Sequence, residues 1–275
     1  MSLINRQAAP PGTAPGASAL SGGGPGGRPE AVRLTQVSKF YGSGSRAVQA
    51  LDKVSLTVAD GEFVCLIGAS GCGKSTLLNL VAGLDSATSG QVSTAGRRVS
   101  LMFQEPALFP WLTAARNVEL ALQAKGVPRA SRQARTAELL ETVRLTGFGD
   151  KRPHELSGGM RQRVAMARAL AQDADVLLMD EPFGALDAMT RDLLHDELER
   201  ICAERTLTVL FVTHNVREAA RLGDRVILLS SRPGRVIEEY SLPRYGERRI
   251  DSPEVSEVAA RLTDRLREEM GRHGH

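Results

Sequence analysis

The chain has 275 residues, enough for one large or two modest domains, and its formal net charge is only +3. Because this weak positive charge is spread along the sequence, it gives no reason to expect nucleic acid as a partner. The three cysteines include no C-x-x-C pair, so they suggest neither a disulfide framework nor a zinc site, and they favour the cytosol. No apolar run approaches the roughly 18–20 residues of a membrane-spanning helix. If the protein meets a membrane, we expect it to lie beside it.

The first part of the chain predicts a tail followed by a small β-layer. Residues 1–29 are rich in Gly, Pro, Ala and Ser and cannot bury enough surface to fold, so we expect a disordered leader. Residues 31–41 and 54–58 alternate apolar and polar side chains, as half-buried strands do. Asp60-Gly61 is typical of a hairpin turn that leads into the next strand. We therefore expect a largely antiparallel β-layer.

A phosphate-binding loop comes next. Residues 68–76 read GASGCGKST and fit the pattern G-x-x-x-x-G-K-[ST]. The apolar run at 63–67 predicts a buried strand before the loop, and residues 77–82 predict a helix that ends at Gly83. Glycines let the backbone wrap around an anion, with N–H groups and the helix N-terminus toward the phosphates. The expected nucleotide contacts are Gly68, Ala69, Ser70, Gly71, Cys72, Gly73, Lys74, Ser75 and Thr76.

The remaining elements alternate between helices and strands. Two short β-type runs lie within 91–103, and the two prolines in 105–111 prevent a continuous helix there. Helices are expected at 113–125 (with Thr113 as N-cap), 131–145, 157–171, 188–205, 215–222 and 253–270, and strands at 174–180, 208–213, 225–230 and 235–242. This alternation predicts a parallel, doubly wound α/β core. An inserted helical subdomain is expected at about 105–172.

The last predicted helix carries an apolar stripe along one face. We expect this stripe to pack on the core rather than bind a partner. Its members are Val255, Val258, Ala259, Leu262, Leu266 and Met270.

Polar side chains at predicted strand ends suggest the chemistry, because open α/β sheets bind ligands there. Lys74 is placed to reach the β- and γ-phosphates, while Ser75 and Asp180 would hold Mg²⁺. Glu181 would polarise the attacking water. His214 follows the 208–213 strand and is either structural or a stabiliser of charge at the γ-phosphate. Gln104 has a similar place, and it could bind Mg²⁺ or the attacking water, although position alone leaves its role open.

A second glycine loop, LSGGMRQ at 156–162, opens a helix and so predicts a second anion site. Ser157 could also be a plain N-cap. One subunit cannot easily place both loops around one nucleotide. The second loop therefore suggests a dimer that closes over ATP.

These motifs together resemble the ATP-binding subunit of ABC transporters, in matching order from about residue 31 to about residue 242. The resemblance implies a phosphate-loop ATPase core with a parallel sheet, an N-terminal antiparallel β-layer and an inserted α-helical subdomain. It implies a head-to-tail homodimer with two ATP molecules, in which Ser157, Gly158 and Gly159 meet the partner's nucleotide. It also implies that Asp187 links the two sites, that Tyr41 stacks on adenine, and that residues 105–117 form a groove for a membrane subunit. The ATPase domain would span 30–245, followed by a helical tail at 246–275.

Within that family, residues 103–113, 179–188, 231–235 and 251–254 resemble the importers of nitrate, sulfonate and taurine. The resemblance implies an ATP-hydrolysing subunit of a bacterial importer at the cytoplasmic face of the membrane, most similar to those for aliphatic sulfonates. Taurine, nitrate or bicarbonate are alternative solutes, and a soluble ABC ATPase is a distant alternative. The implied partners are a second copy, two permease subunits and, indirectly, an extracytoplasmic solute-binding protein.

Overall fold

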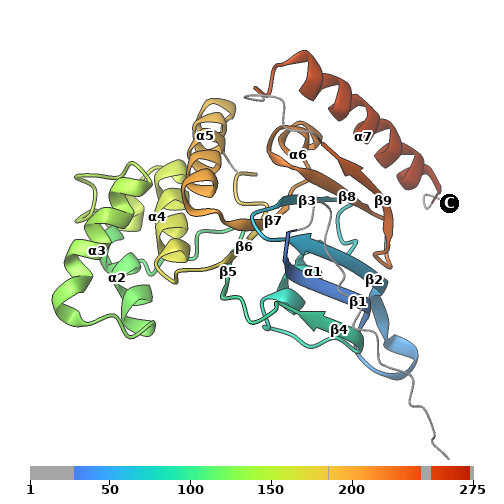
Figure 1. The fold of residues 1–275 in the computed structure, drawn as a ribbon, viewed down its shortest axis with the longest axis horizontal. Helices are drawn as coiled ribbons and strands as arrows, with labels where there is room; N and C mark the ends of the chain where they lie inside the picture. The colour runs from blue at the N-terminus through green and yellow to red at the C-terminus, as the bar shows by residue number, and fades with distance from the viewer. Residues whose placement is uncertain (1–27, 185, 243–248, 273–275) are drawn as a thin grey trace, which may run out of the picture.

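The computed structural model describes residues 28–184, 186–242 and 249–272. Within them the strands form a six-stranded and a three-stranded sheet (Figure 1). In spatial order the larger sheet contains β5 (Val99–Met102), β6 (Val176–Asp180), β7 (Thr208–Val212), β3 (Phe63–Ile67), β8 (Arg225–Leu229) and β9 (Val236–Ser241). Strands β5 to β8 of this order are parallel, and β9 is antiparallel to β8. The predicted parallel α/β core is confirmed, with an antiparallel strand added at one edge.

The smaller sheet is antiparallel, with the order β2-β1-β4. Its strands are β1 (Glu30–Tyr41), β2 (Val48–Ala59) and β4 (Ser89–Ser93). The expected β-layer is confirmed, but the expected hairpin at Asp60-Gly61 is wrong. A turn does occur there, with Gly61 at φ +69°, yet β2 and β3 belong to different sheets. Because β3 is apolar on both faces, it takes the fully buried place between β7 and β8, and the turn carries the chain from one sheet to the other.

The helices cover the larger sheet on both faces (Figure 1). They are α1 (Lys74–Val81), α2 (Ala114–Ala124), α3 (Arg129–Thr142), α4 (Gly158–Leu170), α5 (Ala188–Arg205), α6 (Val216–Leu222) and α7 (Pro253–Arg272), with short 3-10 turns at Gly44–Arg46 and Pro153–Glu155. Polar side chains accept backbone N–H groups at the starts of four helices, as N-caps do. These caps are Thr113, Ser157, Asp187 and Asn215.

The two faces of the larger sheet bury different residues of the same strands. In β3, Phe63, Cys65 and Ile67 join the core beneath α4, α5 and α6, whereas Val64 and Leu66 join the core shared with α1 and the smaller sheet. All five side chains are buried. Burial on both faces explains why this strand is a continuous apolar run and not an alternating one.

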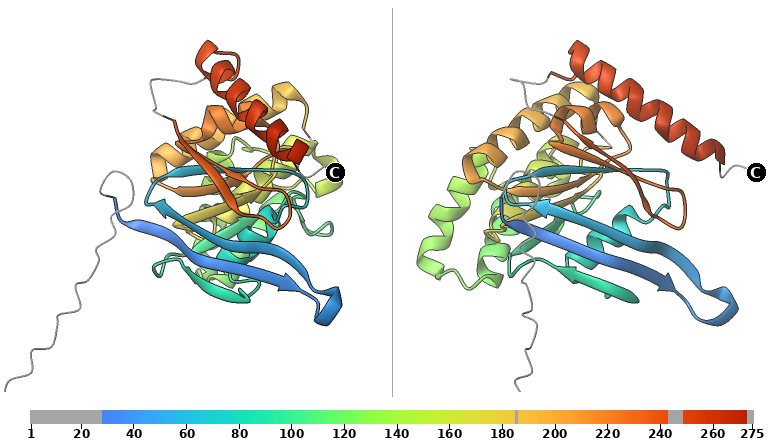
Figure 2. Two further views of the ribbon diagram at one scale, coloured as in Figure 1. Left: turned by 90° about the vertical axis from the view of Figure 1, so that its right-hand side faces the viewer. Right: turned by 45° about the vertical axis from the view of Figure 1, so that its right-hand side comes forward.

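Helix α7 packs against α6, as Figure 2 shows from two sides. Val255, Ala259 and Leu262 are buried in this contact. Nε of Arg265 donates to Oε2 of Glu238 on β9 at 2.7 Å. The prediction that this helix packs on the core is confirmed for these residues, while the side chain of Met270 lies outside the described part.

The predicted domain boundaries stay predictions. Nearly all of the expected leader, residues 1–27, lies outside the described residues, as do residues 243–248 and 273–275. Helices α2, α3 and α4 pack together at one end of the molecule, where the inserted helical subdomain was expected (Figure 1). Among the described residues, no helix combines the length and apolar character needed to cross a bilayer.

Candidate functional site

The phosphate-binding loop joins β3 to α1. Helix α1 begins at Lys74, and its ammonium donates to the carbonyl oxygens of Gly68 at 2.9 Å and Ala69 at 3.0 Å. These two hydrogen bonds hold the ammonium over the start of the loop, and the Lys74 residue is buried. The first-turn N–H groups of α1 have no intrahelical partners, so the loop offers a positive charge and backbone donors to one anion.

The shape of the loop also fits phosphate. Gly73 has φ +101°, and a Cβ atom there would lie 2.7 Å from Cδ2 of Leu51 and 2.8 Å from the Ala50 carbonyl oxygen. A side chain at this position would push the loop off β2. The glycine therefore lets the backbone of the loop pass close to β2.

Asp180 lies at the end of β6, and its carboxylate hydrogen-bonds to Ser75 in the first turn of α1. Burial raises the pKa of Asp180, and the nearby Glu181 adds to this, whereas Ser75 and Lys74 oppose it. No group of three or more His, Cys, Asp or Glu side chains that could hold a metal occurs among the described residues. A buried carboxylate beside a hydroxyl nevertheless fits Mg²⁺, which binds proteins through one or two such groups together with substrate phosphates.

Glu181 and His214 lie side by side at the same sheet edge. Nδ1 of His214 is 2.9 Å from Oε2 of Glu181. Glu181 has φ +44°, a left-handed conformation that is strained for a residue with a Cβ atom. Its backbone N–H donates to the Val212 carbonyl oxygen at 2.9 Å, which holds the strained residue against β7. Strain of this kind is typical of functional sites.

A buried polar network lies next to His214, and no sequence motif indicates it. The hydroxyl of Thr213 donates to Glu218, and Nε2 of His195 lies 2.6 Å from the other oxygen of that carboxylate. The Thr213 hydroxyl also accepts the backbone N–H of Asn215 at 3.0 Å. The residues on both sides of His214 are thus fixed by α5 and α6, which orients the turn that carries the imidazole.

Gln104 lies two residues beyond β5, at the sheet edge where Asp180 and Glu181 also lie. The Gln104 residue is exposed. Its backbone carbonyl oxygen accepts a hydrogen bond from Nε2 of Gln162 on α4 at 3.0 Å. The backbone of Gln104 therefore connects the sheet edge to α4. The hydrogen bonds that join Asp180 to Ser75 and His214 to Glu181 do not include it.

Tyr41 at the end of β1 lies beside the first turn of α1. Its hydroxyl donates to Oδ2 of Asp85 at 3.1 Å and lies 3.5 Å from the Thr76 hydroxyl. The ammonium of Lys39 lies 5.0 Å from the centre of the Tyr41 ring and bonds to Asp85. Lys39 hydrogen-bonds to Asp85 and so lowers the pKa of that carboxyl. Sequence reasoning identified Tyr41 but missed Lys39 and Asp85, since a Lys and an Asp in these places match no motif.

The second glycine loop is separate from the first. Ser157 caps α4 by accepting the N–H of Met160 at 3.2 Å, and Asp187 caps α5 by accepting that of Thr190 at 2.9 Å. A Cβ atom at Gly159 would overlap with the Thr190 side chain, so the two helix starts are in contact. Figure 1 shows α4 and α1 in different parts of the molecule. Ala185, which precedes Asp187 in the motif, lies outside the described residues.

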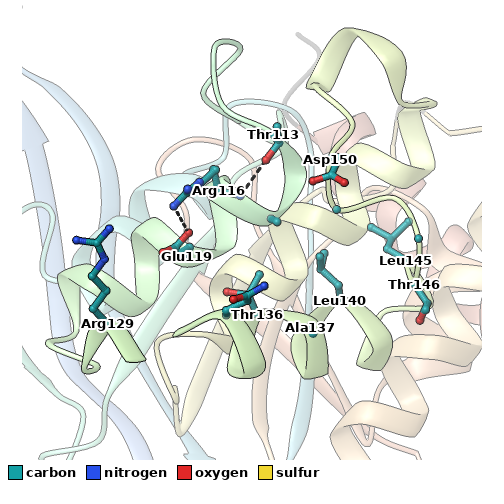
Figure 3. Close-up of a pocket in the computed structure, with 14 residues that line it drawn as sticks. Thr113, Arg116, Glu119, Arg129, Thr136, Ala137, Leu140, Leu145, Thr146 and Asp150 are labelled. Carbon is teal, nitrogen blue, oxygen red and sulfur yellow. Dashed lines mark hydrogen bonds and ion pairs between the residues drawn. The ribbon is translucent and has the colours of Figure 1, made fainter. Parts of the chain in front are cut away.

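A pocket of about 550 Å³ opens between α2, α3 and the loop that follows α3 (Figure 3). Its lining includes Thr113, Arg116, Thr136, Leu140 and Asp150. The hydroxyl of Thr136 is buried and has no hydrogen-bond partner in the described part of the chain. Buried hydroxyls in proteins usually have a hydrogen-bond partner, so Thr136 is an exception beside this pocket.

Comparisons with known proteins agree with this site. The ABC transporter family model matches residues 51–184. A taurine import ATP-binding protein from Burkholderia pseudomallei is 45% identical over 249 residues, covering 85% of this chain and 96% of the relative. This chain belongs to the ABC transporter family. An aliphatic sulfonates import ATP-binding protein from Bacillus cereus is 44% identical, and the match covers 77% of this chain and 87% of the relative. A nitrate import ATP-binding protein from Synechocystis is 43% identical, and the match covers 78% of this chain and 84% of the relative.

A solved structure of an ABC transporter cassette shares the fold. It is a dimeric ATP-binding cassette in a post-hydrolysis state with bound ADP and Pi. It is 36% identical, with a TM-score of 0.69, and the match covers 78% of this chain and all of the other. The ATP-binding cassette fold expected from the motifs is therefore confirmed.

Proposed function

We propose that this chain binds and hydrolyses ATP as the energising subunit of an importer, at the cytoplasmic face of the membrane. The observation that carries the proposal is the meeting of Glu181 and His214 at the sheet edge that also holds the phosphate loop and Asp180. A carboxylate beside an imidazole can take a proton from water and stabilise the charge that develops at a phosphate.

The roles of the side chains follow from their places. Lys74 and the loop N–H groups would bind the β- and γ-phosphates. Ser75, Asp180 and Gln104 would hold Mg²⁺, which when bound neutralises charge on the phosphate oxygens. Glu181 would polarise the attacking water, and His214 would hold Glu181 in place and face the γ-phosphate. Tyr41 would stack on the adenine, since its ring lies beside the first turn of α1.

We propose that the ATP site is completed by a second copy of the chain. Support comes from the positions of α4 and α1 in different parts of the molecule and from the dimeric state of the solved cassette. Ser157, Gly158 and Gly159 would meet the partner's γ-phosphate, and Asp187, whose helix touches α4, would link the two sites.

The membrane permease would bind near residues 105–117. Phe109 and Trp111 lie there with ring centres 5.5 Å apart, and Trp111 is 69% exposed. An exposed aromatic pair is typical of a protein interface. The pocket in Figure 3 adjoins this segment through Thr113 and Arg116.

For the solute we propose aliphatic sulfonates, with taurine, nitrate and bicarbonate as alternatives, delivered by an extracytoplasmic binding protein. The relatives named for taurine, sulfonates and nitrate are similar in identity, at 43–45%. The test is twofold. The purified chain with its permease should release phosphate from ATP, and calorimetry on the binding protein should show sulfonate binding tighter than that of the other three anions. Absence of ATP hydrolysis, or co-purification with nucleic acid in place of a permease, would refute the importer role.

A further inference from the structure

The turn between β8 and β9, residues 230–235, lies directly against the phosphate loop. Nε of Arg232 donates to the Gly71 carbonyl oxygen at 3.2 Å. A Cβ atom at Gly234 would overlap with the Cys72 carbonyl oxygen, and one at Gly68 would lie 3.0 Å from that of Leu229. Three residues of the loop thus touch this turn or the strand that leads into it.

Several hydrogen bonds hold the turn in one conformation. The Ser230 hydroxyl donates to the Pro233 carbonyl oxygen at 2.7 Å and accepts the N–H of Arg235 at 2.9 Å. Gly234 is tied to β2 on both sides, because its N–H donates to Ala50 and its carbonyl oxygen accepts the N–H of Asp52, both at 2.9 Å. The turn is therefore a fixed support for the loop.

The two arginines of the turn differ in their partners. Nε of Arg235 donates to Oδ2 of Asp52 at 2.8 Å, so a carboxylate neutralises its charge. Among the described residues, Arg232 forms no ion pair with a carboxylate, and its guanidinium donates a hydrogen bond only to the carbonyl oxygen of Gly71. An uncompensated cation beside a phosphate site adds to the positive potential there.

The hydrogen bond of Arg232 also orients a peptide group. In a trans peptide the C=O and N–H point in opposite directions. When Arg232 holds the Gly71 oxygen outward, the N–H of Cys72 must point into the loop, where it meets the Ala69 carbonyl oxygen at 3.3 Å. That distance is long for a hydrogen bond, so this N–H remains able to donate to an anion in the loop.

We propose that Arg232 is a positioning residue for the nucleotide, which acts through the Gly71 carbonyl and through its unpaired charge. This inference rests on the ATP binding proposed above. Because Arg232 acts on the phosphate loop of its own subunit, it strengthens the binding of ADP and of ATP to the same extent. A residue that met the nucleotide only across a dimer interface would affect ATP alone.

The test compares Arg232→Leu with Arg235→Leu in the full chain. Calorimetry with Mg²⁺·ADP and with a non-hydrolysable ATP analogue should show both dissociation constants raised about 3- to 10-fold by Arg232→Leu, the size of a typical net hydrogen-bond contribution, because the variant acts on the nucleotide only through the loop and through space. Arg235→Leu should leave both dissociation constants unchanged. Arg232→Lys, which keeps a charge and a donor, should recover part of the loss. The melting temperature without nucleotide should stay that of the wild type.

Equal affinities for the two leucine variants would overturn the inference, and so would an effect on the ATP analogue alone. A fall in nucleotide-free melting temperature that accounts for the weaker binding would show a merely structural role. If Arg232→Leu does not fold, Arg232→Gln replaces it in the same comparison. Failure of the wild type to bind either nucleotide would instead refute the proposed function.

Discussion

Nδ1 of His214 lies 2.9 Å from Oε2 of Glu181, although 33 residues separate them in the sequence. The two residues meet because β6 and β7 are adjacent and parallel, with Asp180 opposite Val212, so the chain leaves both strands at the same edge. The imidazole is 64% exposed, whereas the carboxylate is 22% exposed. The His214 imidazole is therefore open to a ligand, whereas the Glu181 carboxylate is largely enclosed by the protein.

This pair predicts the behaviour of Glu181→Gln. The amide keeps the shape and a hydrogen bond to His214 but cannot accept a proton from water. We expect phosphate release to fall about 100- to 1000-fold, the contribution typical of a general base. Binding of ATP should persist, and the closed dimer should accumulate on a sizing column with ATP.

The matched control for this variant is Glu257→Gln on the exposed face of α7, which should hydrolyse ATP as the wild type does. Normal phosphate release by Glu181→Gln would remove Glu181 from the role of water activator.

Much of this edge could be predicted from local patterns. The apolar runs of β3, β6 and β7 are long enough to be recognised as buried strands, and parallel strands bring their carboxyl ends to one edge. The strand ends therefore predict that Asp180, Glu181 and His214 lie at one sheet edge. The N-caps Thr113 and Ser157 could be predicted in the same way, because a cap bonds to a backbone N–H only two or three residues further along the chain.

The parts that local patterns missed are contacts between distant segments. The hydrogen bond from Arg232 to Gly71 joins residues 161 positions apart, and Lys39 meets Asp85 across 46. The hairpin expected at Asp60-Gly61 failed for the same reason. The turn residues do form a turn, but whether the flanking strands pair with each other depends on the burial of β3 between β7 and β8.

The second glycine loop predicts hydrolysis that depends on two subunits. Ser157→Arg places a long cation where the partner's γ-phosphate is expected, so a homodimer of this variant should lose nearly all activity. Mixed dimers with a Lys74→Ala subunit provide the test. If the loops act across the interface, each ATP site combines Lys74 of one subunit with Ser157 of the other. The number of intact sites in a mixed dimer then depends on whether the two substitutions lie on the same subunit or on different ones.

A mixed dimer with both substitutions on one subunit should disable both composite sites. A dimer with Ser157→Arg on one subunit and Lys74→Ala on the other should keep one site intact, with about half of the wild-type phosphate release if the sites act independently. Equal rates for the two arrangements would contradict a shared site. Thr113→Arg, which also replaces an N-cap, controls for the loss of about 1 kcal/mol of cap stability.

The aromatic pair of Phe109 and Trp111 predicts where the permease binds. Trp111→Ala removes a ring that is 69% exposed and whose ring neighbour is Phe109, itself exposed. We expect at least about a tenfold weaker association with the permease, as truncation of an aromatic hot spot produces. ATP hydrolysis by the isolated subunit should be unchanged. Leu84→Ala, at a side chain that is 63% exposed, is the control and should assemble normally, whereas equal loss in both variants would argue against this surface.

The raised pKa of Asp180 predicts a stability that depends on pH. Burial raises the pKa of Asp180 because it disfavours the charged carboxylate in the folded state. At low pH the carboxyl is protonated in both the folded and the unfolded state, so its burial then carries no charge penalty. As the pH rises through the ordinary pKa of Asp and then through the raised one, the unfolded chain ionises first and the folded state loses stability. Asp180→Asn removes this titration. Without nucleotide, the variant should therefore melt at a higher temperature than the wild type at pH 7, and the gap should close near pH 4.

Addition of Mg²⁺ and ATP should reverse that order at pH 7. A ligand that binds the folded state stabilises it by an amount that grows with the logarithm of its affinity. The wild type should therefore gain melting temperature, while Asp180→Asn, with a weakened Mg²⁺ site, gains less. Thermal melts with and without Mg²⁺·ATP give both results on the same samples. Asp264→Asn at the exposed face of α7 should follow the wild type in every condition. An Asp180→Asn protein that melts below the wild type without nucleotide at pH 7 would show that the carboxylate stabilises the fold, against the direction of its pKa.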